Sequence, residues 1–107
     1  MSLLFWMIVG HAVCDYPLQG DFLARGKNHK APIPGIDWWI CLMAHSVIHA
    51  GAVVLVTGNL VLGLAEFWFH CVIDYGKCDG HFDFKVDQAL HIICKICWTV
   101  VLTLVAL

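Results

Sequence analysis

The chain has 107 residues, of which 61% are hydrophobic and 13% are charged, and its formal net charge is −2. Its mean hydropathy is +0.81. A domain of this size has a large surface for its volume, so a water-soluble chain needs more polar residues than this to cover it. The composition therefore favours a membrane protein, with the lipid bilayer as its main partner. The six basic residues form no run or repeating stripe, which excludes nucleic acid as a predicted partner.

Four apolar segments follow one another within what we predict to be a single domain, residues 1–107. Pro17 ends the first segment because proline disfavours helix at the residue before it. Asp37 is a suitable N-cap for the second, and Gly58-Asn59 breaks the chain before the third. We therefore predict an all-α integral membrane bundle of four transmembrane helices, the first one short. The predicted helices cover about residues 2–16, 37–57, 60–76 and 85–107.

The lengths of these segments decide how well each one crosses a bilayer. Segments 37–57 and 85–107 have about 20 residues or more, enough for a hydrocarbon core of about 30 Å at about 1.5 Å per residue. Segment 60–76 is slightly short. Segment 2–16 provides only about 22 Å and needs local thinning or a polar neighbour at its end. Three spanning helices plus one partial insertion is the alternative.

The basic residues of the connections predict the orientation. Arg25, Lys27 and Lys30 lie between the first and second segments, and Lys77 and Lys85 lie between the third and fourth. The connection between the second and third segments carries no basic residue. The positive-inside rule therefore places loop 17–36 in the cytoplasm and both termini outside it.

Loop 17–36 has a mixed pattern of apolar and charged residues. Leu18, Phe22 and Leu23 fit one side of a short interfacial helix, with Asp21 and Arg25 on the other side. An ordinary solvated loop is the alternative, and the sequence does not decide between the two.

Every apolar segment carries ionisable residues four positions apart, and histidine is a member of every such set. Residues at i and i+4 lie on one face of a helix. Each predicted helix therefore presents a polar stripe. In chain order the stripes are His11 and Asp15; His45 and His49; Glu66, His70 and Asp74; and Asp87, His91 and Lys95.

The stripes are expected to meet in one layer of the bundle. Counted from the predicted cytoplasmic ends, most of these groups lie within about 15 Å of the boundary. An ionisable group facing hydrocarbon costs about 2.5–3.5 kcal/mol, so the stripes should face inward. Imidazole and carboxylate together suit a divalent transition metal such as zinc, manganese or iron, and helix bundles build such sites from facing helices. A hydrogen-bonded network without metal is the alternative. The predicted ligands are His11, Asp15, His45, His49, His70, Asp74, Asp87 and His91.

Two lysines border this predicted site. Lys95 lies deep in the last segment, at a depth similar to that of Glu66, and can neutralise that carboxylate across the bundle or bind an anionic substrate group. Lys77 lies at the predicted headgroup boundary, where its ammonium can reach lipid phosphate or receive a phosphate group.

The motifs HAVCDYPLQGDFLARGK, HSVIH, HCVIDYGK and DQALH occur in this order along the chain. In this order they resemble domain-of-unknown-function family 3307, small multi-helix membrane proteins of bacteria and phages. The resemblance runs from His11 to His91 and implies an integral membrane protein, which we expect in the bacterial inner membrane. It implies no activity. His29 and His81 fall in segments that look variable and receive no role. The matching positions add Gln19, Asp21, Lys27, Lys77 and Gln88 to the polar site.

Three functions are compatible with such a site. The leading hypothesis is a metal-dependent hydrolase on a membrane-proximal substrate, in which the metal activates water and Glu66 or Asp87 is the general base. The second is a proton or metal-ion transporter, although the apolar outer halves of the segments favour a one-sided site over a channel. The third is a non-catalytic phage or bacterial membrane accessory protein, whose polar layer only defines helix packing. A homo-oligomer is left open.

Overall fold

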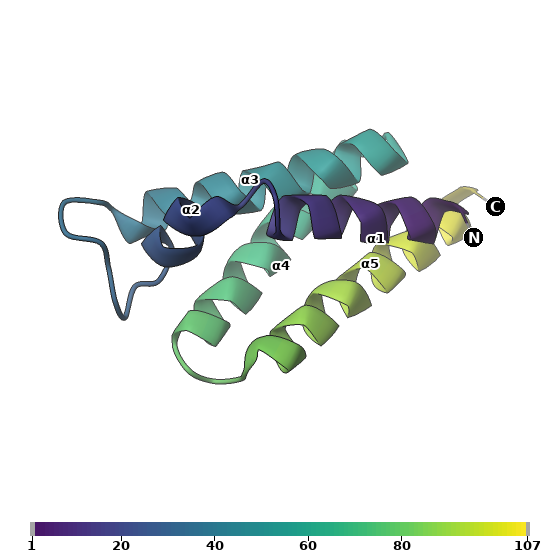
Figure 1. Ribbon diagram of the computed structural model, residues 1–107. Coiled ribbons are helices and arrows are strands. Elements are labelled where there is room, and N and C mark those ends of the chain that lie inside the picture. The colour runs from purple at the N-terminus through teal and green to yellow at the C-terminus, as the bar shows by residue number, and fades with distance from the viewer. Residues whose placement is uncertain (1, 107) are drawn as a thin grey trace.

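The computed structural model describes residues 2–106, which form five α-helices and no β-strand (Figure 1). The predicted all-α class is therefore confirmed. The helix beyond the four predicted ones is short and lies within loop 17–36, so the structure favours the helical alternative for that segment. The helices are α1 (Ser2–Asp15), α2 (Gly20–Gly26), α3 (Trp38–Thr57), α4 (Leu60–Cys78) and α5 (Phe84–Ala106).

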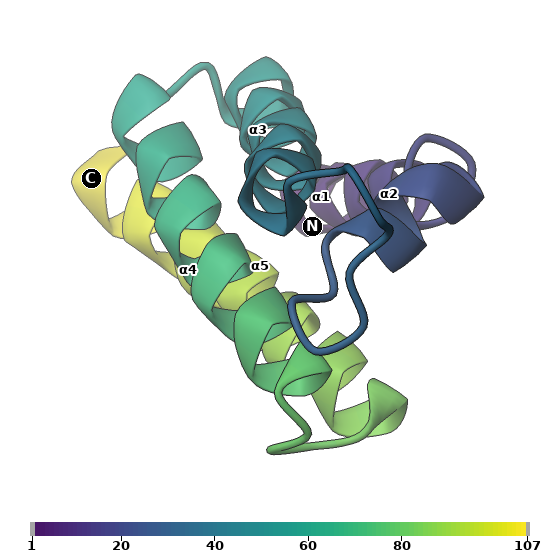
Figure 2. The same ribbon diagram turned by 90° about the vertical axis from the view of Figure 1, so that its left-hand side faces the viewer.

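The four long helices enclose one interior. Figure 1 shows α1 and α3 antiparallel and side by side, while α4 and α5 form a second antiparallel pair. Helix α3 packs against both α1 and α4, and α5 packs against α4 and α1. Figure 2 shows that the two pairs cross obliquely. Both ends of the chain lie at one end of the bundle. The opposite end, which we call the α2 end, carries α2 and the α4–α5 loop.

The reversal between α3 and α4 follows from two residues. Gly58 ends α3 in the left-handed conformation, with φ of 68°, which glycine adopts without a Cβ penalty. The Asn59 side chain then accepts a hydrogen bond from the backbone N–H of Leu62 and caps α4. The predicted break at Gly58-Asn59 is confirmed. Helix α3 begins after Asp37 as predicted, but the Asp37 side chain makes no capping hydrogen bond.

The distribution of polar and apolar residues is the reverse of that in a soluble domain. The exposed surface carries large apolar side chains on all four long helices, among them Leu55, Val61, Trp68 and Val105, and Leu55 is 87% exposed. The interior holds only a small apolar core: Met7, Val53, Leu62, Ile73, Cys94 and Trp98. The buried polar and charged residues are His11, Asp15, Lys27, His45, Ser46, His49, Glu66, His70, Asp74, Asp87, His91 and Lys95.

The prediction of four transmembrane helices needs correction. Within residues 2–106, two helices are long and apolar enough to cross a membrane, at Trp38–Thr57 and Phe84–Val105. Helix α1 has 14 residues and reaches only about 21 Å. Helix α4 has 19 residues but includes Glu66, Asp74 and Lys77, which lower its hydropathy. The prediction counted both helices as spanning because most of their residues are apolar. It gave too little weight to the short length of α1 and to the charged residues of α4.

The close approach of α3 and α4 depends on Gly63. A Cβ at this position would collide with Val54 Cγ2 and lie 3.2 Å from the Ala50 carbonyl oxygen. We expect Gly63→Ala to lower the free energy of unfolding by about 1–3 kcal/mol, as overpacking of a tight contact does. Gly51→Ala is the matched control, since a Cβ on Gly51 meets no atom within 4 Å among the described residues. Thermal unfolding in detergent measures both, and equal midpoints would contradict the role of Gly63.

Candidate metal centre

The predicted stripes of α1, α3, α4 and α5 meet in the interior, and one further residue reaches them from the segment after α2. All are buried except Gln88, which is half-buried. We call this set the polar cluster: His11, Asp15, Lys27, His45, His49, Glu66, His70, Asp74, Asp87, Gln88, His91 and Lys95.

Two imidazoles of α3 converge on one carboxylate of α1. The Nε2 atoms of His45 and His49 lie 3.1 and 2.9 Å from Asp15 Oδ1. The ring of His70 on α4 stacks on that of His49, with ring centroids 3.8 Å apart. One ligand atom from each of Asp15, His45, His49 and His70 lies within 4.8 Å of the others. This first ligand set is compact enough for small side-chain shifts to bring four ligands to one ion.

The orientation of His70 is fixed by Glu66. The Nδ1–H of His70 donates to Glu66 Oε2 over 3.0 Å, so Nε2 is the ring nitrogen with a free lone pair. His70 Nε2 is buried and makes no hydrogen bond within residues 2–106, although Asp74 Oδ2 lies 3.3 Å away. An imidazole that donates one N–H to a carboxylate and presents its other nitrogen is the usual arrangement of a metal-binding histidine.

Glu66 itself has little capacity left to act as a base. Its Oε1 accepts hydrogen bonds from Lys95 Nζ at 2.9 Å and from Trp98 Nε1 at 2.8 Å, while Oε2 accepts from His70. The predicted contact between Lys95 and Glu66 is therefore present. The sequence analysis did not single out Trp98, although it lies three residues after Lys95 and hence on the same helical face. The three donors favour a role for Glu66 in positioning His70.

Asp74 stands at the centre of the cluster. Its Oδ2 accepts a hydrogen bond from Lys27 Nζ at 2.7 Å, and its Oδ1 lies 2.9 Å from His91 Nε2. Lys27 follows α2 and reaches into the interior from the α2 end, where only 6% of the residue is exposed. The family resemblance placed Lys27 in the site, whereas local periodicity could not, because Lys27 belongs to no apolar segment.

Helices α1 and α5 are joined through Gln88. Its Nε2 donates to Asp15 Oδ2 at 2.7 Å, and its Oε1 accepts from His11 Nε2 at 3.0 Å. The neighbouring Asp87 is buried, and its Oδ1 lies 3.4 Å from His91 Nε2. This Asp87 oxygen accepts no hydrogen bond from the described residues. Of the two predicted general bases, Asp87 is therefore the one with a free acceptor.

Three predicted members lie at the margin of the cluster or away from it. Gln19 borders it, since its Nε2 donates to the backbone oxygen of Asp15 at 3.0 Å. Asp21 is exposed and pairs with Arg25 on the surface of α2. The Nζ of Lys77 lies 5.4 Å from the centroid of the Phe84 ring. Asp21 and Lys77 are thus not brought together with the imidazoles.

A smaller ionic contact closes the α2 end. The Nε2 atom of His29 lies 2.9 Å from Asp79 Oδ1, and the Nε2 atom of His81 lies 2.9 Å from Asp79 Oδ2. The hydrogen bond from His29, with a smaller contribution from Lys30, holds the pKa of the Asp79 carboxyl below its usual value. The His29 ring also stacks on Tyr75, with centroids 3.9 Å apart. The sequence analysis gave these two histidines no role, because both fall in segments that look variable. The contact of His29 with Asp79 also joins residues 50 positions apart, which no local pattern reveals.

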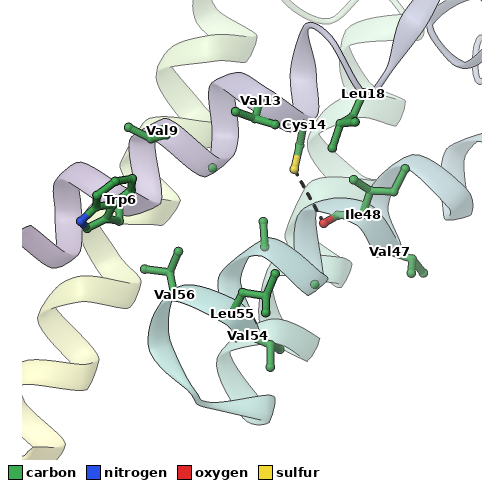
Figure 3. A pocket seen from close by; sticks show the side chains of 13 residues that line it. Trp6, Val9, Val13, Cys14, Leu18, Val47, Ile48, Val54, Leu55 and Val56 are labelled. Carbon is green, nitrogen blue, oxygen red and sulfur yellow. Dashed lines mark hydrogen bonds between the residues drawn. The ribbon is translucent and has the colours of Figure 1, made fainter.

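An apolar groove of about 690 Å³ lies outside the polar cluster, between α1 and α3 (Figure 3). Trp6, Val9 and Val13 border it on α1, and Ile48 and Leu55 border it on α3. Across it the Cys14 thiol donates to the Ile48 carbonyl oxygen at 3.8 Å. The groove is lined almost entirely by apolar side chains, of the kind that the four long helices expose elsewhere.

The fold and the cluster together define an all-α protein with a histidine–carboxylate interior and an apolar exterior. The chain belongs to the family described as "Protein of unknown function (DUF3307)", whose match covers residues 3–107. The resemblance drawn from the four motifs is therefore confirmed. No curated protein and no solved structure matches the chain.

Proposed function

We propose that this protein is an integral membrane protein that binds a divalent transition metal in the polar cluster and uses the ion to hydrolyse a membrane-proximal substrate. The observation that carries the metal site is the first ligand set. His45 and His49 converge on Asp15 Oδ1, Glu66 holds His70 with one ring nitrogen free, and ligand atoms of Asp15 and the three histidines lie within 4.8 Å of one another. Zinc, manganese and iron all accept such ligands.

The charge of the cluster supports a cation. Four carboxylates, on Asp15, Glu66, Asp74 and Asp87, face two ammonium groups, on Lys27 and Lys95. With neutral imidazoles, the buried cluster carries two negative charges in excess. Buried charge without compensation is costly, and one divalent ion balances this excess.

The membrane assignment is supported by the apolar exterior. Side chains as large as Trp68 and Leu55 are exposed around a charged interior, which suits lipid better than water. Helices α3 and α5 are long enough to span, and α1 and α4 would complete the bundle beside them. The α2 end carries the basic residues Arg25, Lys30 and Lys77, so we assign it to the cytoplasm and both termini to the other side. We propose the bacterial inner membrane as the location.

Hydrolysis is the chemistry that this site supports best. A bound divalent ion lowers the pKa of its water toward neutrality and so supplies a nucleophile. Asp87 has a buried oxygen free to accept the proton of that water. Asp15 and Lys27 are 9% and 6% exposed, and they stand at the end of α1 and directly after α2. We therefore place substrate access at this cytoplasmic end, where the Lys27 ammonium would attract an anionic group.

A proton or metal-ion transporter is the second candidate, because the cluster is a continuous chain of titratable groups from Lys27 to Lys95. The half of the interior nearer the chain termini argues against a continuous polar path for ions through the bundle. Met7, Val53 and Leu62, together with Trp98, form an apolar core beyond Glu66. Metal or proton flux into liposomes, lost in His70→Ala, would reverse this ranking. A non-catalytic accessory role predicts a folded protein without bound metal.

The metal content of the purified full chain tests the proposal. We expect wild-type protein in detergent to retain stoichiometric zinc, manganese or iron, and His45→Ala/His49→Ala to lose at least one ion per chain. His81→Ala is the matched control, since this histidine is exposed and lies outside the polar cluster. Elemental analysis after desalting provides the measurement. Wild-type protein that is folded and active without metal would remove the proposal.

A further inference from the structure

The polar cluster contains a second set of candidate ligands beside the first. One atom each from Asp74, Asp87 and His91 lies within 4.8 Å of the others. These three residues are all buried, and none belongs to the first ligand set. We propose that they bind a second divalent cation, so that the cluster is a two-ion centre with the Asp74 carboxylate as the bridge. This inference rests on the proposed metal site.

Asp87 supplies the independent observation that points to a ligand. Asp87 is only 3% exposed, and its Oδ1 accepts no hydrogen bond within residues 2–106. The other oxygen, Oδ2, accepts from Gln88 Nε2 at 3.2 Å. The free oxygen faces His91 Nε2 at 3.4 Å. A buried carboxylate oxygen without a donor is unfavourable in a closed interior, and a cation between Asp87 and His91 removes that deficit. In the two-ion centre Asp87 is therefore a metal ligand, and it is a free base only when the first ion is bound alone.

The two oxygens of Asp74 face different sets. Its Oδ1 lies 2.9 Å from His91 Nε2, within the second set. Its Oδ2 lies 3.3 Å from His70 Nε2 and 3.5 Å from His45 Nε2, which belong to the first. A carboxylate placed in this way can give one oxygen to each of two ions. Paired ions of this kind hold both the attacking and the leaving oxygen of a hydrolytic reaction.

The charge also distinguishes a two-ion centre from a single site. One divalent cation neutralises the two excess negative charges of the cluster, and a second leaves it positive by two. A two-ion centre therefore requires two further negative charges, which a bridging hydroxide and an anionic substrate group supply together. Lys27, bound to Asp74 Oδ2, lies on the side from which such an anion would enter.

Manganese serves as the probe, because a carboxylate-bridged pair of Mn²⁺ ions gives an exchange-coupled EPR spectrum that isolated ions do not. We expect the detergent-purified full chain to bind two Mn²⁺ ions with a coupled spectrum. Asp87→Asn should retain one ion and lose the coupling, while the exposed Asp21→Asn should keep both ions. His45→Ala/His49→Ala should retain at most one.

The outcomes separate this inference from the proposed function. A single Mn²⁺ ion in wild type, unchanged in Asp87→Asn, would overturn the second site and leave the first intact. Two ions without exchange coupling would overturn the bridge. Wild-type protein that binds no metal would overturn the proposed function itself. If Asp87→Asn does not fold, the stoichiometry and spectrum of the wild type still decide the question.

Discussion

Replacing Asp74 with alanine is expected to lower the free energy of unfolding by about 3–5 kcal/mol, the usual effect of breaking a buried ion pair. The Asp74 carboxylate is 2.7 Å from Lys27 Nζ and 2.9 Å from His91 Nε2. Its removal leaves the Lys27 ammonium in a closed interior without its counter-ion. The loss should therefore exceed the effect of any exposed carboxylate in the chain.

Chemical or thermal unfolding of the detergent-solubilised protein measures this effect. Asp21→Ala is the control, since Asp21 is exposed and its pair with Arg25 should contribute less than about 1 kcal/mol. Lys27→Met combined with Asp74→Ala should recover part of the lost stability, because no buried charge then lacks a partner. An Asp74→Ala midpoint equal to that of the Asp21 control would show that the buried pair does not stabilise the fold.

The second large effect is expected at Lys95, which lies in the deepest part of the cluster. Its Nζ is 2.9 Å from Glu66 Oε1, and both residues are 1% exposed. Lys95→Met keeps the apolar stem and removes the charge, so it leaves Glu66 with only the Trp98 and His70 donors. We expect a loss of about 3–5 kcal/mol.

A double-mutant cycle separates the ion pair from simple packing. Adding Glu66→Gln to Lys95→Met removes the remaining unpaired charge and should restore stability toward the wild type. Lys85→Met, at an exposed lysine on the same helix, should change the midpoint little. If the double variant is as unstable as the sum of its two single variants, the two side chains do not act as a pair.

These expectations follow from the position of the charged groups. Charge that is normally at the surface of a protein is here inside a bundle of four helices, and each carboxylate lies close to at least one nitrogen of an imidazole, an ammonium or an amide. Such an interior tolerates few substitutions, because each removed partner leaves another group unsatisfied. The apolar exterior, by contrast, is expected to accept changes that preserve its hydrophobicity.

The sequence determined the helices and the stripes because both are local properties. The bounds of α3 and α5 follow from the length of the apolar runs and from Gly58 and the polar loops. Spacing of four residues puts His45 and His49, or Glu66, His70 and Asp74, on one helical face whatever surrounds them. The cost of ionisable groups in an apolar setting then implied that the stripes face one another.

Only the tertiary structure decided which groups meet. Local periodicity cannot show that Lys27 enters from outside the apolar segments, that Gln88 joins α1 to α5, or that Glu66 is occupied by three donors. The overestimate of the spanning helices was not of this kind, because the charges of α4 and the length of α1 are properties of the sequence itself. Contacts between helices, which in the cluster join residues 17 to 77 positions apart, depend on how helices cross, and crossing is set by side-chain packing along their whole length. The sequence thus determined which face of each helix is polar, and the packing of the four helices determined which polar side chains contact one another.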